Sequence, residues 1–187
     1  MADAGRVIAG TARGIRLEAP GEGTRPFGDR VKQTLFAVLD PDLPGARVLD
    51  LFAGSGAAGI EALSRGARHA TFVERDRDAV RVIAANLART HIAVRASVVR
   101  ADALDWLRHA GPAEPFAIAI VDPPYAHPDL LEAVLEALGP HLAPDARVVA
   151  KHFWRDQPPA QVGLLASERE RRFGETALTF YRRQEKR

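Results

Sequence analysis

The stretch Arg47-Val48-Leu49-Asp50-Leu51-Phe52-Ala53-Gly54-Ser55-Gly56-Ala57-Ala58-Gly59 decides the fold of this chain. A short apolar run leads to an acid, three glycines follow with the spacing G-x-G-x-x-G, and residues 60–65 begin a helix. This order of strand, glycine turn and helix is typical of α/β folds in which the backbone approaches a bound nucleotide. The acid at the strand end disfavours a phosphate and favours a ligand with a cation or an amino group. S-adenosylmethionine, which carries a sulfonium and an ammonium, therefore fits this loop better than NAD does.

The tetrapeptide Asp122-Pro123-Pro124-Tyr125 is the second informative feature, and it follows an apolar run at residues 116–121 that predicts a buried strand. The two prolines remove two N–H donors and fix φ, and the residue before them is held extended. The loop is therefore expected to present acceptors only, beside an aromatic ring. This combination suits the planar amine of a nucleobase. The structural alternative is a simple strand-to-loop turn that the prolines terminate and the tyrosine ring caps.

Further acids stand at the ends of other predicted strands. Glu74 lies roughly 20 residues beyond the glycine loop, where an acid can hold ribose hydroxyls. Asp102 follows the apolar residues Val98 and Val99 and is placed to accept a hydrogen bond from an adenine amine. Each acid alone is more often a solvated strand terminus or a helix N-cap, and Asp76 is expected to be such a cap. Together, acidic strand ends in successive βα units favour a nucleotide-like ligand.

The remaining sequence predicts an alternation of strands and helices. Residues 5–19 are expected to form a short hairpin around two glycines, and residues 29–39 a helix with one apolar face. The βα units then continue to the region of His141, which predicts a mostly parallel sheet with helices on both faces. Additional strands are expected at residues 147–150 and 177–181.

These residues resemble the motif set of the class I S-adenosylmethionine-dependent amino-methyltransferases. Three further stretches narrow the resemblance to the bacterial small-subunit (16S) rRNA guanine-N2 methyltransferase family of the RsmD type: residues 24–36, residues 6–10 and residues 173–176. The resemblance covers nearly the whole chain. Two departures occur, because the family usually has two threonines where this chain has Phe27 and Gly28, and commonly an acid where it has Lys151.

The resemblance implies a fold, a domain division and a site. The expected fold is an α/β, Rossmann-like class I methyltransferase fold: a seven-stranded, mostly parallel sheet with one antiparallel strand (residues 177–181), helices on both faces and a small N-terminal β-hairpin extension. Residues 1–23 would form that extension, which would offer an RNA contact, and residues 24–187 the methyltransferase domain. The expected catalytic residues are Asp122, Pro123, Pro124 and Tyr125. The residues expected to bind S-adenosylmethionine, and its product S-adenosylhomocysteine, are Arg25, Asp50, Phe52, Ala53, Gly54, Gly56, Glu74, Arg75, Asp102 and Ala103.

The composition fits one ordinary domain, since 187 residues with 47% hydrophobic side chains can bury a full core. There is no cysteine and the six histidines are scattered singly, so neither a disulfide framework nor a metal site is expected. No stretch resembles a signal peptide or a bilayer span, so we expect a cytoplasmic protein without a membrane partner. The family resemblance implies a monomer.

Arginine dominates the basic residues, since lysine occurs only three times. An arginine side chain can donate two hydrogen bonds to one phosphate and can stack on a base. A GC-rich genome explains the abundance of arginine equally well, and the formal net charge of the chain is only +2. The N-terminal group is interpreted as phosphate contacts: Arg6, Arg13, Arg16, Arg25 and Arg30. Glutamates interleave with the C-terminal group, which is interpreted as a solvated, salt-bridged face: Arg169, Arg171, Arg172, Arg182 and Arg183.

Three functions compete on these observations. The first is methyl transfer from S-adenosylmethionine to a guanine N2 amine in small-subunit rRNA, with a ribosomal subunit or an assembly intermediate as the partner. The second is methyl transfer to another amine, such as adenine N6 or a glutamine side chain, although a glutamine target would favour Asn at position 122. The third is an RNA-binding module with a degenerate cofactor site, which the intact glycines and strand-end acids disfavour. Only the family resemblance selects guanine over adenine.

Overall fold

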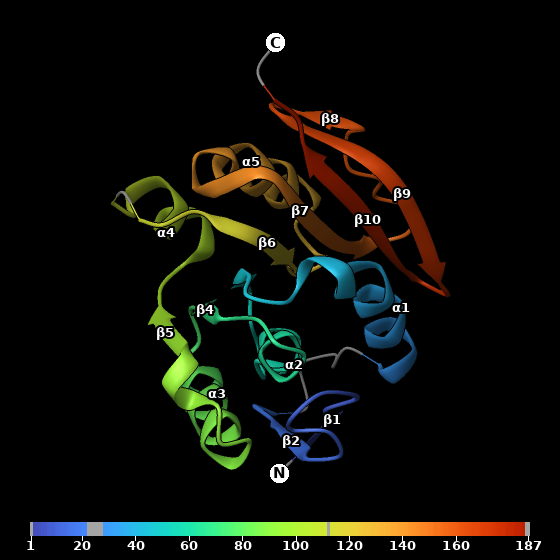
Figure 1. Cartoon of the computed structure of the whole chain (residues 1–187). Helices are drawn as coiled ribbons and strands as arrows, with labels where there is room; N and C mark the ends of the chain where they lie inside the picture. Colours follow the sequence, from blue (N-terminus) through green and yellow to red (C-terminus); the bar gives the residue numbers. More distant parts are fainter. Residues whose placement is uncertain (1, 22–27, 112, 186–187) are drawn as a thin grey trace.

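A twisted sheet forms the centre of the computed structural model, which describes residues 2–21, 28–111 and 113–185 (Figure 1). The strands of this sheet are β3 (Arg47–Leu51), β4 (His69–Glu74), β5 (Ala96–Arg100), β6 (Phe116–Val121), β7 (Leu142–Phe153), β8 (Gln161–Val162), β9 (Leu165–Phe173) and β10 (Thr176–Arg183). Their spatial order is β5-β4-β3-β6-β7-β10-β9-β8. The helices are α1 (Asp29–Leu39), α2 (Ala57–Ser64), α3 (Arg77–Arg89), α4 (Ala103–His109) and α5 (Pro128–Leu138), with single 3-10 turns at Asp40–Asp42, Ala93–Arg95 and Gly139–His141.

The strand directions confirm the expected fold class. Strands β3 to β7 pair in parallel, whereas β10 is antiparallel to both of its neighbours, β7 and β9. Among the seven longer strands, β10 is therefore the one that runs against the others. The eighth strand, β8, has two residues and was not expected. Strand β9 was also not recognised in the sequence, because its run Leu165–Phe173 (LASERERRF) is mostly charged and exposed and shows no apolar alternation.

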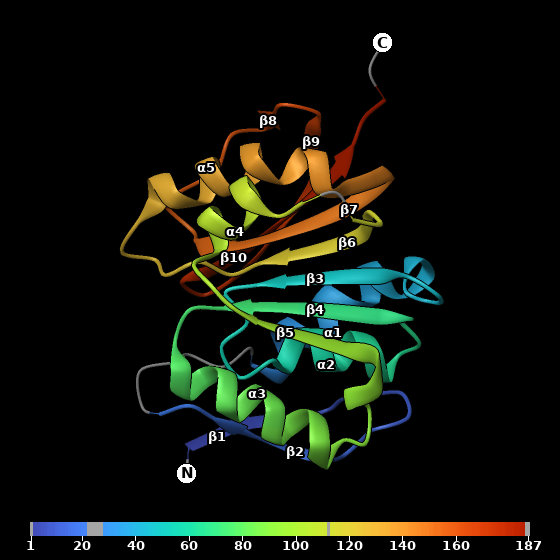
Figure 2. The same cartoon turned by 90° about the vertical axis from the view of Figure 1, so that its left-hand side faces the viewer.

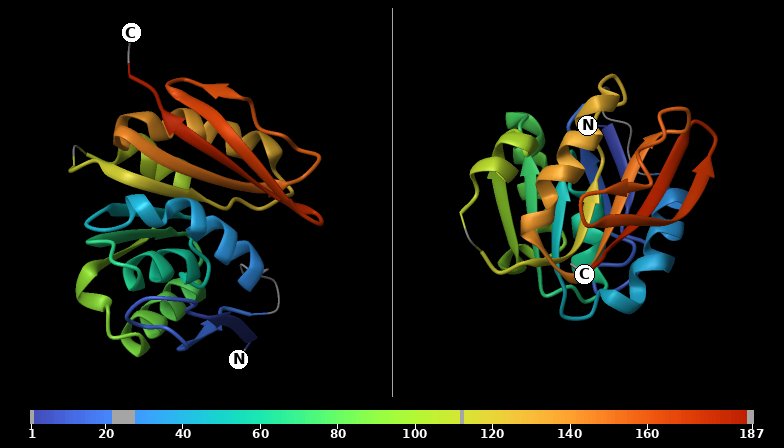
Figure 3. Two further views of the ribbon diagram at one scale, coloured as in Figure 1. Left: turned by 45° about the vertical axis from the view of Figure 1, so that its right-hand side comes forward. Right: turned by 90° about the horizontal axis from the view of Figure 1, so that it is seen from above.

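Two apolar clusters lie on the two faces of the sheet. One joins α1, α2 and α3 to the sheet through side chains such as Phe36, Ile60 and Ile83. The other joins α4 and α5 to the opposite face, with Leu107 and Leu135 among its buried members. Figure 2 shows the two helix layers on either side of the strands, and Figure 3 shows the β9–β10 hairpin at the edge of the sheet beyond β7. Among the described residues, no helix combines the length and the apolar character that a membrane span requires.

The N-terminal hairpin consists of β1 (Ala2–Arg6) and β2 (Arg16–Ala19), as predicted, and it is docked on α2. The fully buried Glu61 accepts hydrogen bonds from the N–H groups of Ile8 (2.8 Å) and Ala9 (3.0 Å). Ser64 Oγ donates to the Ala9 carbonyl (2.6 Å) and accepts from the Ala12 N–H (2.9 Å). Apolar hairpin side chains also belong to the same cluster as α1 and α2. The hairpin therefore shares its core with the rest of the fold.

The domain division proposed at residue 23 stays a prediction. Residues 22–27, which connect the hairpin to α1, lie outside the described residues, and they include Arg25 and Phe27. The helix predicted over residues 29–39 is confirmed as α1. Helix α2 begins at Ala57, three residues before the predicted start, because Gly56 adopts a left-handed conformation (φ +76°) directly before it.

Two glycines of the hairpin loop provide a matched test of its docking. Gly10 and Gly14 have almost the same backbone conformation (φ +82° and +86°), but a Cβ on Gly10 would lie 1.8 Å from the Ser64 carbonyl oxygen, whereas one on Gly14 would meet no atom within 4 Å. We expect Gly14→Ala to lower the free energy of unfolding by about 1–2 kcal/mol, the cost of the left-handed conformation alone. Gly10→Ala should lower it by about 2 kcal/mol more, because the hairpin must move away from α2. Chemical denaturation of both variants measures these changes, and an equal decrease in the free energy of unfolding for Gly10→Ala and Gly14→Ala would contradict the docking of the hairpin on α2.

Candidate active site

A cavity of about 710 Å³ opens at the carboxyl ends of the parallel strands. This is the edge at which open α/β sheets bind their ligands. The loops after β3, β4, β5 and β6 all reach this cavity, and β2, β7 and the β9–β10 turn also contribute. Its lining residues are Ala19, Asp50, Phe52, Ala53, Gly54, Ser55, Ala57, Val73, Glu74, Arg75, Asp76, Ala101, Ala103, Asp122, Pro123, Pro124, Tyr125, Ala126, Lys151, Phe153 and Glu175.

The glycine loop brings the backbone close to both the cavity and the sheet. Phe52 has φ +60°, a left-handed conformation that is uncommon for a residue with a side chain and that often marks a functional site. Gly59 packs so tightly that a Cβ there would lie 2.3 Å from the Phe72 ring. The third glycine of the G-x-G-x-x-G pattern is therefore needed for close packing of α2 on the sheet, and the earlier part of the loop is left to line the cavity.

Asp50 is a buried acid between the sheet and the first turn of α2. Its side chain is nearly inaccessible, and Oδ2 accepts a hydrogen bond from the Gly59 N–H (2.9 Å). Burial raises the pKa of Asp50 to about 8, and the nearby carboxylates of Asp122 and Glu74 add to the rise, whereas the Gly59 N–H opposes it. The cavity edge at this point favours either a proton on Asp50 or a cationic ligand beside it.

Glu74 fixes the glycine loop from the neighbouring strand. Its Oε2 accepts from the Gly54 N–H and its Oε1 accepts from the Asp76 N–H, both at 2.9 Å. Asp76 in turn caps α3, as predicted, by accepting from the Ala79 N–H (2.7 Å). These hydrogen bonds connect the end of β4 to the loop between β3 and α2 and to the start of α3. Because each carboxylate oxygen can accept more than one hydrogen bond, the expected role of Glu74 toward ribose hydroxyls stays open as a prediction.

Asn86 was missed in the sequence, although it connects three elements at the cavity. This fully buried side chain on α3 accepts from the Glu18 N–H and donates to the carbonyls of Glu18 and Ser55, each at 2.9 Å. It therefore joins the N-terminal hairpin to the glycine loop. A polar residue inside a helix pattern gives no local sign of such a role, and only the docking of the hairpin reveals it.

Two expected cofactor residues that the structure describes, Asp102 and Gly56, do not line this cavity, and a third cannot be placed. Asp102 caps α4, where Oδ1 accepts from the N–H groups of Leu104 and Asp105, and its neighbours Ala101 and Ala103 line the cavity instead. Gly56 forms the turn before α2. Arg25 lies outside the described residues. Contacts of these three with a cofactor remain predictions.

Lys151 changes the character of the Asp122 loop. Its Nζ donates to Asp122 Oδ2 at 2.8 Å, so a cation stands where the sequence predicted acceptors only. The cause is the strand register: Val121 on β6 pairs with Ala150 on β7, which places the next residue of each strand side by side. Burial raises the pKa of Asp122, and the Lys151 ammonium offsets part of that rise. Among the described residues, no hydrogen bond or ion pair involves Asp122 Oδ1, so this oxygen can accept a further donor.

Tyr125 is held in place at the mouth of the same loop. Its hydroxyl shares a hydrogen bond with Thr176 Oγ1 at 2.9 Å, and its ring centroid lies 6.3 Å from that of Phe153. Lys151 Nζ lies 5.7 Å from the Tyr125 ring centroid. The ring is partly exposed, so it can contact a planar ligand that enters the cavity beside Asp122.

Comparison with known proteins assigns the family. The family model described as "Conserved hypothetical protein 95" matches residues 5–182. The Escherichia coli protein "Ribosomal RNA small subunit methyltransferase D" is 38% identical over 182 residues, which cover 96% of this chain and 90% of that protein. The chain therefore belongs to the family of ribosomal RNA small subunit methyltransferase D. YlbH of Bacillus subtilis is 39% identical over 182 residues, covering 95% and 98% of the two chains. The solved structure of yhhF from Escherichia coli matches this methyltransferase fold with a TM-score of 0.85 at 37% identity, covering 96% of this chain and 97% of that chain.

The raised pKa of Asp50 makes the stability of this methyltransferase fold depend on pH. The folded state holds the proton up to about pH 8, whereas the unfolded state releases it near the ordinary value of 3.8, so stability falls as the pH rises between these values. Asp50→Asn keeps an acceptor for the Gly59 N–H but cannot ionise. Between about pH 5 and pH 7, the variant should gain about 1.4 kcal/mol per pH unit in free energy of unfolding relative to the wild type. The measurement is the free energy of unfolding of both proteins in denaturant titrations at several pH values. If the difference between variant and wild type does not change with pH, burial of Asp50 does not control its ionisation.

Proposed function

We propose that this protein transfers a methyl group from S-adenosylmethionine to the exocyclic N2 amine of a guanine in small-subunit rRNA. One observation carries the proposal: a single cavity is lined on one side by the glycine loop with Glu74 and on the other by Asp122 to Tyr125. A cofactor on the first side and a base amine on the second would face each other. The relatives, which are rRNA methyltransferases by name, support rRNA as the substrate class, and the motif resemblance described above supports guanine N2.

The residues on the glycine-loop side fit S-adenosylmethionine. The cavity volume of about 710 Å³ is within the range of small-molecule sites, roughly 300–1,000 Å³. Glu74, and Asp50 once a cation beside it displaces its proton, suit a ligand with cationic groups and ribose hydroxyls, and Phe52 and Ala103 would provide apolar contact for a purine ring. When bound, the cofactor supplies an electrophilic methyl group on a sulfonium. The residues proposed to hold it are Arg25, Asp50, Phe52, Ala53, Gly54, Gly56, Glu74, Arg75, Asp102 and Ala103.

Asp122 would orient the attacking amine. The guanine amine is a poor nucleophile because its lone pair is delocalised into the ring. Hydrogen bonds from this amine to Asp122 Oδ1 and to the Pro123 carbonyl would favour a pyramidal nitrogen with its lone pair directed at the methyl group. Lys151 holds the other oxygen, Oδ2, and so fixes the rotation of the carboxylate. Such alignment can lower the activation free energy by at most about 7–11 kcal/mol.

Asp122 would also balance the charge that develops on the substrate nitrogen. As the new N–C bond formed and the bond from the methyl group to sulfur broke, leaving the thioether S-adenosylhomocysteine, positive charge would pass to the nitrogen, and a fixed carboxylate beside it would stabilise that charge. The amine must then lose a proton. Because burial raises the pKa of Asp122, this carboxylate accepts a proton more readily than an exposed aspartate and can pass it to solvent.

Tyr125 would hold the target base after it leaves its stack. Enzymes that modify a base take it out of the helix or act on a single strand, and RNA loops with splayed bases are commonly bound by stacking on aromatic side chains. The tyrosine ring is fixed by Thr176 and Phe153, so little freedom remains to be lost on binding. A stacked base contributes about 1–3 kcal/mol to binding.

We also propose that the protein is a cytoplasmic monomer that acts on a small ribosomal subunit or on an assembly intermediate.

A methyl-transfer assay tests the proposed function. Labelled S-adenosylmethionine is offered with small ribosomal subunits, naked rRNA and duplex DNA, and the labelled base is identified by nuclease digestion and mass spectrometry. We expect N2-methylguanine in rRNA. Label in adenine would retain the chemistry and overturn the target, and cofactor binding without transfer to any substrate would favour a non-catalytic RNA-binding module.

Substitution of Asp122 tests the proposed catalytic role. Asp122→Asn keeps the size and one acceptor oxygen but removes the charge, and it should lower the single-turnover rate of methyl transfer by about 100-fold or more. Cofactor affinity should change less than about threefold, since the cofactor is held by the other side of the cavity. The matched control is Asp129→Asn, which removes an exposed acid at the start of α5. Near wild-type turnover by Asp122→Asn, with normal thermal stability, would show that this carboxylate is not required.

A further inference from the structure

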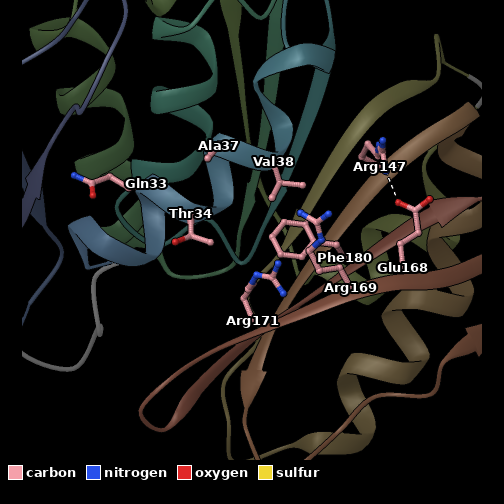
Figure 4. A pocket seen from close by; sticks show the side chains of 9 residues that line it. All are labelled: Gln33, Thr34, Ala37, Val38, Arg147, Glu168, Arg169, Arg171 and Phe180. Atoms are coloured by element: carbon pink, nitrogen blue, oxygen red, sulfur yellow. Dashed lines mark hydrogen bonds and ion pairs between the residues drawn. The ribbon is translucent and has the colours of Figure 1, made fainter.

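A second groove, of about 780 Å³, lies between α1 and the β9–β10 side of the sheet (Figure 4). We call it the α1–β9 groove. It is separate from the candidate active site, because the two cavities share no lining residue. Figure 4 shows the side chains of α1 on one wall and those of the strands on the other. The lining residues are Gln33, Thr34, Ala37 and Val38 from α1, Arg147 from β7, Glu168, Arg169 and Arg171 from β9, and Phe180 from β10.

Strand alternation separates the charges that are interleaved in the β9 sequence. Arg169 pairs with Phe180 and Arg171 pairs with Leu178, so both arginines stand on the face of β9 that borders the groove. Glu170, between them, pairs with Thr179 and points to the opposite face, as expected for a strand. Among the described residues, no carboxylate lies within ion-pair distance of Arg169 or Arg171. The interpretation of this segment as a salt-bridged face therefore does not hold for these two arginines.

The remaining charges of the groove are neutralised. Arg147 pairs with Asp42 (3.2 Å) and with Glu168. Glu168 reaches the groove because the register of β9 against β10 shifts between Phe180 and Tyr181. The C-terminal Arg182, which belongs to the same sequence group, pairs with Asp145 at 3.3 Å. The two exposed guanidinium groups of Arg169 and Arg171 thus carry the uncompensated positive charge of this wall.

Arg171 of the groove lies in strand register with Lys151. Arg171, Leu178 and Lys151 lie in one row across β9, β10 and β7. Neighbouring strands are about 4.8 Å apart, so the Cα atoms of Arg171 and Lys151 are separated by roughly 10 Å. Lys151 is the residue that donates to Asp122. A polynucleotide whose base occupies the candidate active site would therefore have its flanking backbone within reach of this row.

We propose that the α1–β9 groove binds the sugar-phosphate backbone of rRNA beside the target nucleotide, with Arg169 and Arg171 contacting phosphates. The inference rests on the proposed function. A guanidinium is well suited to phosphate, because its planar fork donates two hydrogen bonds to one anion. Phe180 at the floor is buried by its neighbours and offers no free face for a stacked base. The groove would consequently position the RNA without reading its sequence.

Salt dependence of binding tests this proposal. Each phosphate contact with a single strand adds about 0.7 to the slope of log K against log salt concentration, so Arg169→Ala/Arg171→Ala should reduce the slope by about 1.4. The probe is naked small-subunit rRNA, titrated in a KCl series. The lysine pair Arg169→Lys/Arg171→Lys retains the charge and should keep a slope close to that of the wild type. The matched control is Arg81→Ala/Arg108→Ala, which removes two exposed arginines from α3 and α4.

Outcomes of this experiment separate the two proposals. The groove proposal predicts a higher KM for RNA in the alanine pair with kcat unchanged, because neither arginine touches the reacting atoms. The groove proposal is overturned if Arg169→Ala/Arg171→Ala keeps the salt-dependence slope of the wild type. It is also overturned if the control variant Arg81→Ala/Arg108→Ala shows an equal decrease in slope, because the change in net charge alone would then explain the result. If the wild type methylates rRNA and the alanine pair behaves like it, only the groove proposal fails. A wild-type protein that neither binds nor methylates RNA overturns both.

Discussion

The parallel register of the central strands is the constraint on which the site depends. Leu51 at the end of β3 pairs with Val73 on one side and Val121 on the other, and Val121 pairs with Ala150. Strands β3, β4 and β6 therefore end at one edge, and the loops that follow them start from the same line, whereas β7 continues past this line to Phe153. A slip of one residue would turn the side chains of a strand to the opposite face and separate the residues that now meet. The cavity is a consequence of this alignment, and so is the contact between Lys151 and Asp122.

Electrostatic balance at this edge is unusual, because several carboxylates gather where the solvent has been excluded. Glu74 accepts hydrogen bonds from two backbone N–H groups, whereas Asp50, whose pKa burial raises to about 8, holds a proton at neutral pH unless a cation binds beside it. Asp122 has the Lys151 ammonium beside it. The negative side of the cavity is thereby suited to a cationic small molecule, whereas the neutral pair at the other side is suited to an uncharged amine. The same edge can bind two chemically different partners for this reason.

Local patterns predicted the parts of the fold and site that depend on local chemistry. The glycine turn, the Asp-Pro-Pro-Tyr loop, helix α1 and the Asp76 cap each follow from residue types at short spacing, and the structure has them where the sequence placed them. Features that depend on distant pairing were not accessible. Strand β9 is held by its register with β10 rather than by apolar residues, Asn86 acquires its partners only when the hairpin docks, and Lys151 meets Asp122 through strand order. Asp102 shows the reverse case, since a strand-end acid can be used by the helix that follows it.

The docking of the N-terminal hairpin has a consequence for the order in which the chain becomes structured during synthesis. The hairpin leaves the ribosome well before its hydrogen-bond partners: Ser64 is 52 residues after Ala12, and Asn86 is 68 residues after Glu18. The nascent hairpin cannot bury its polar backbone until α2 and α3 have emerged. Closing such long loops costs entropy before any contact is gained. The hairpin can thus reach its final place only after Asn86 has been made, and the glycine loop, which shares Asn86 with it, is completed at the same time.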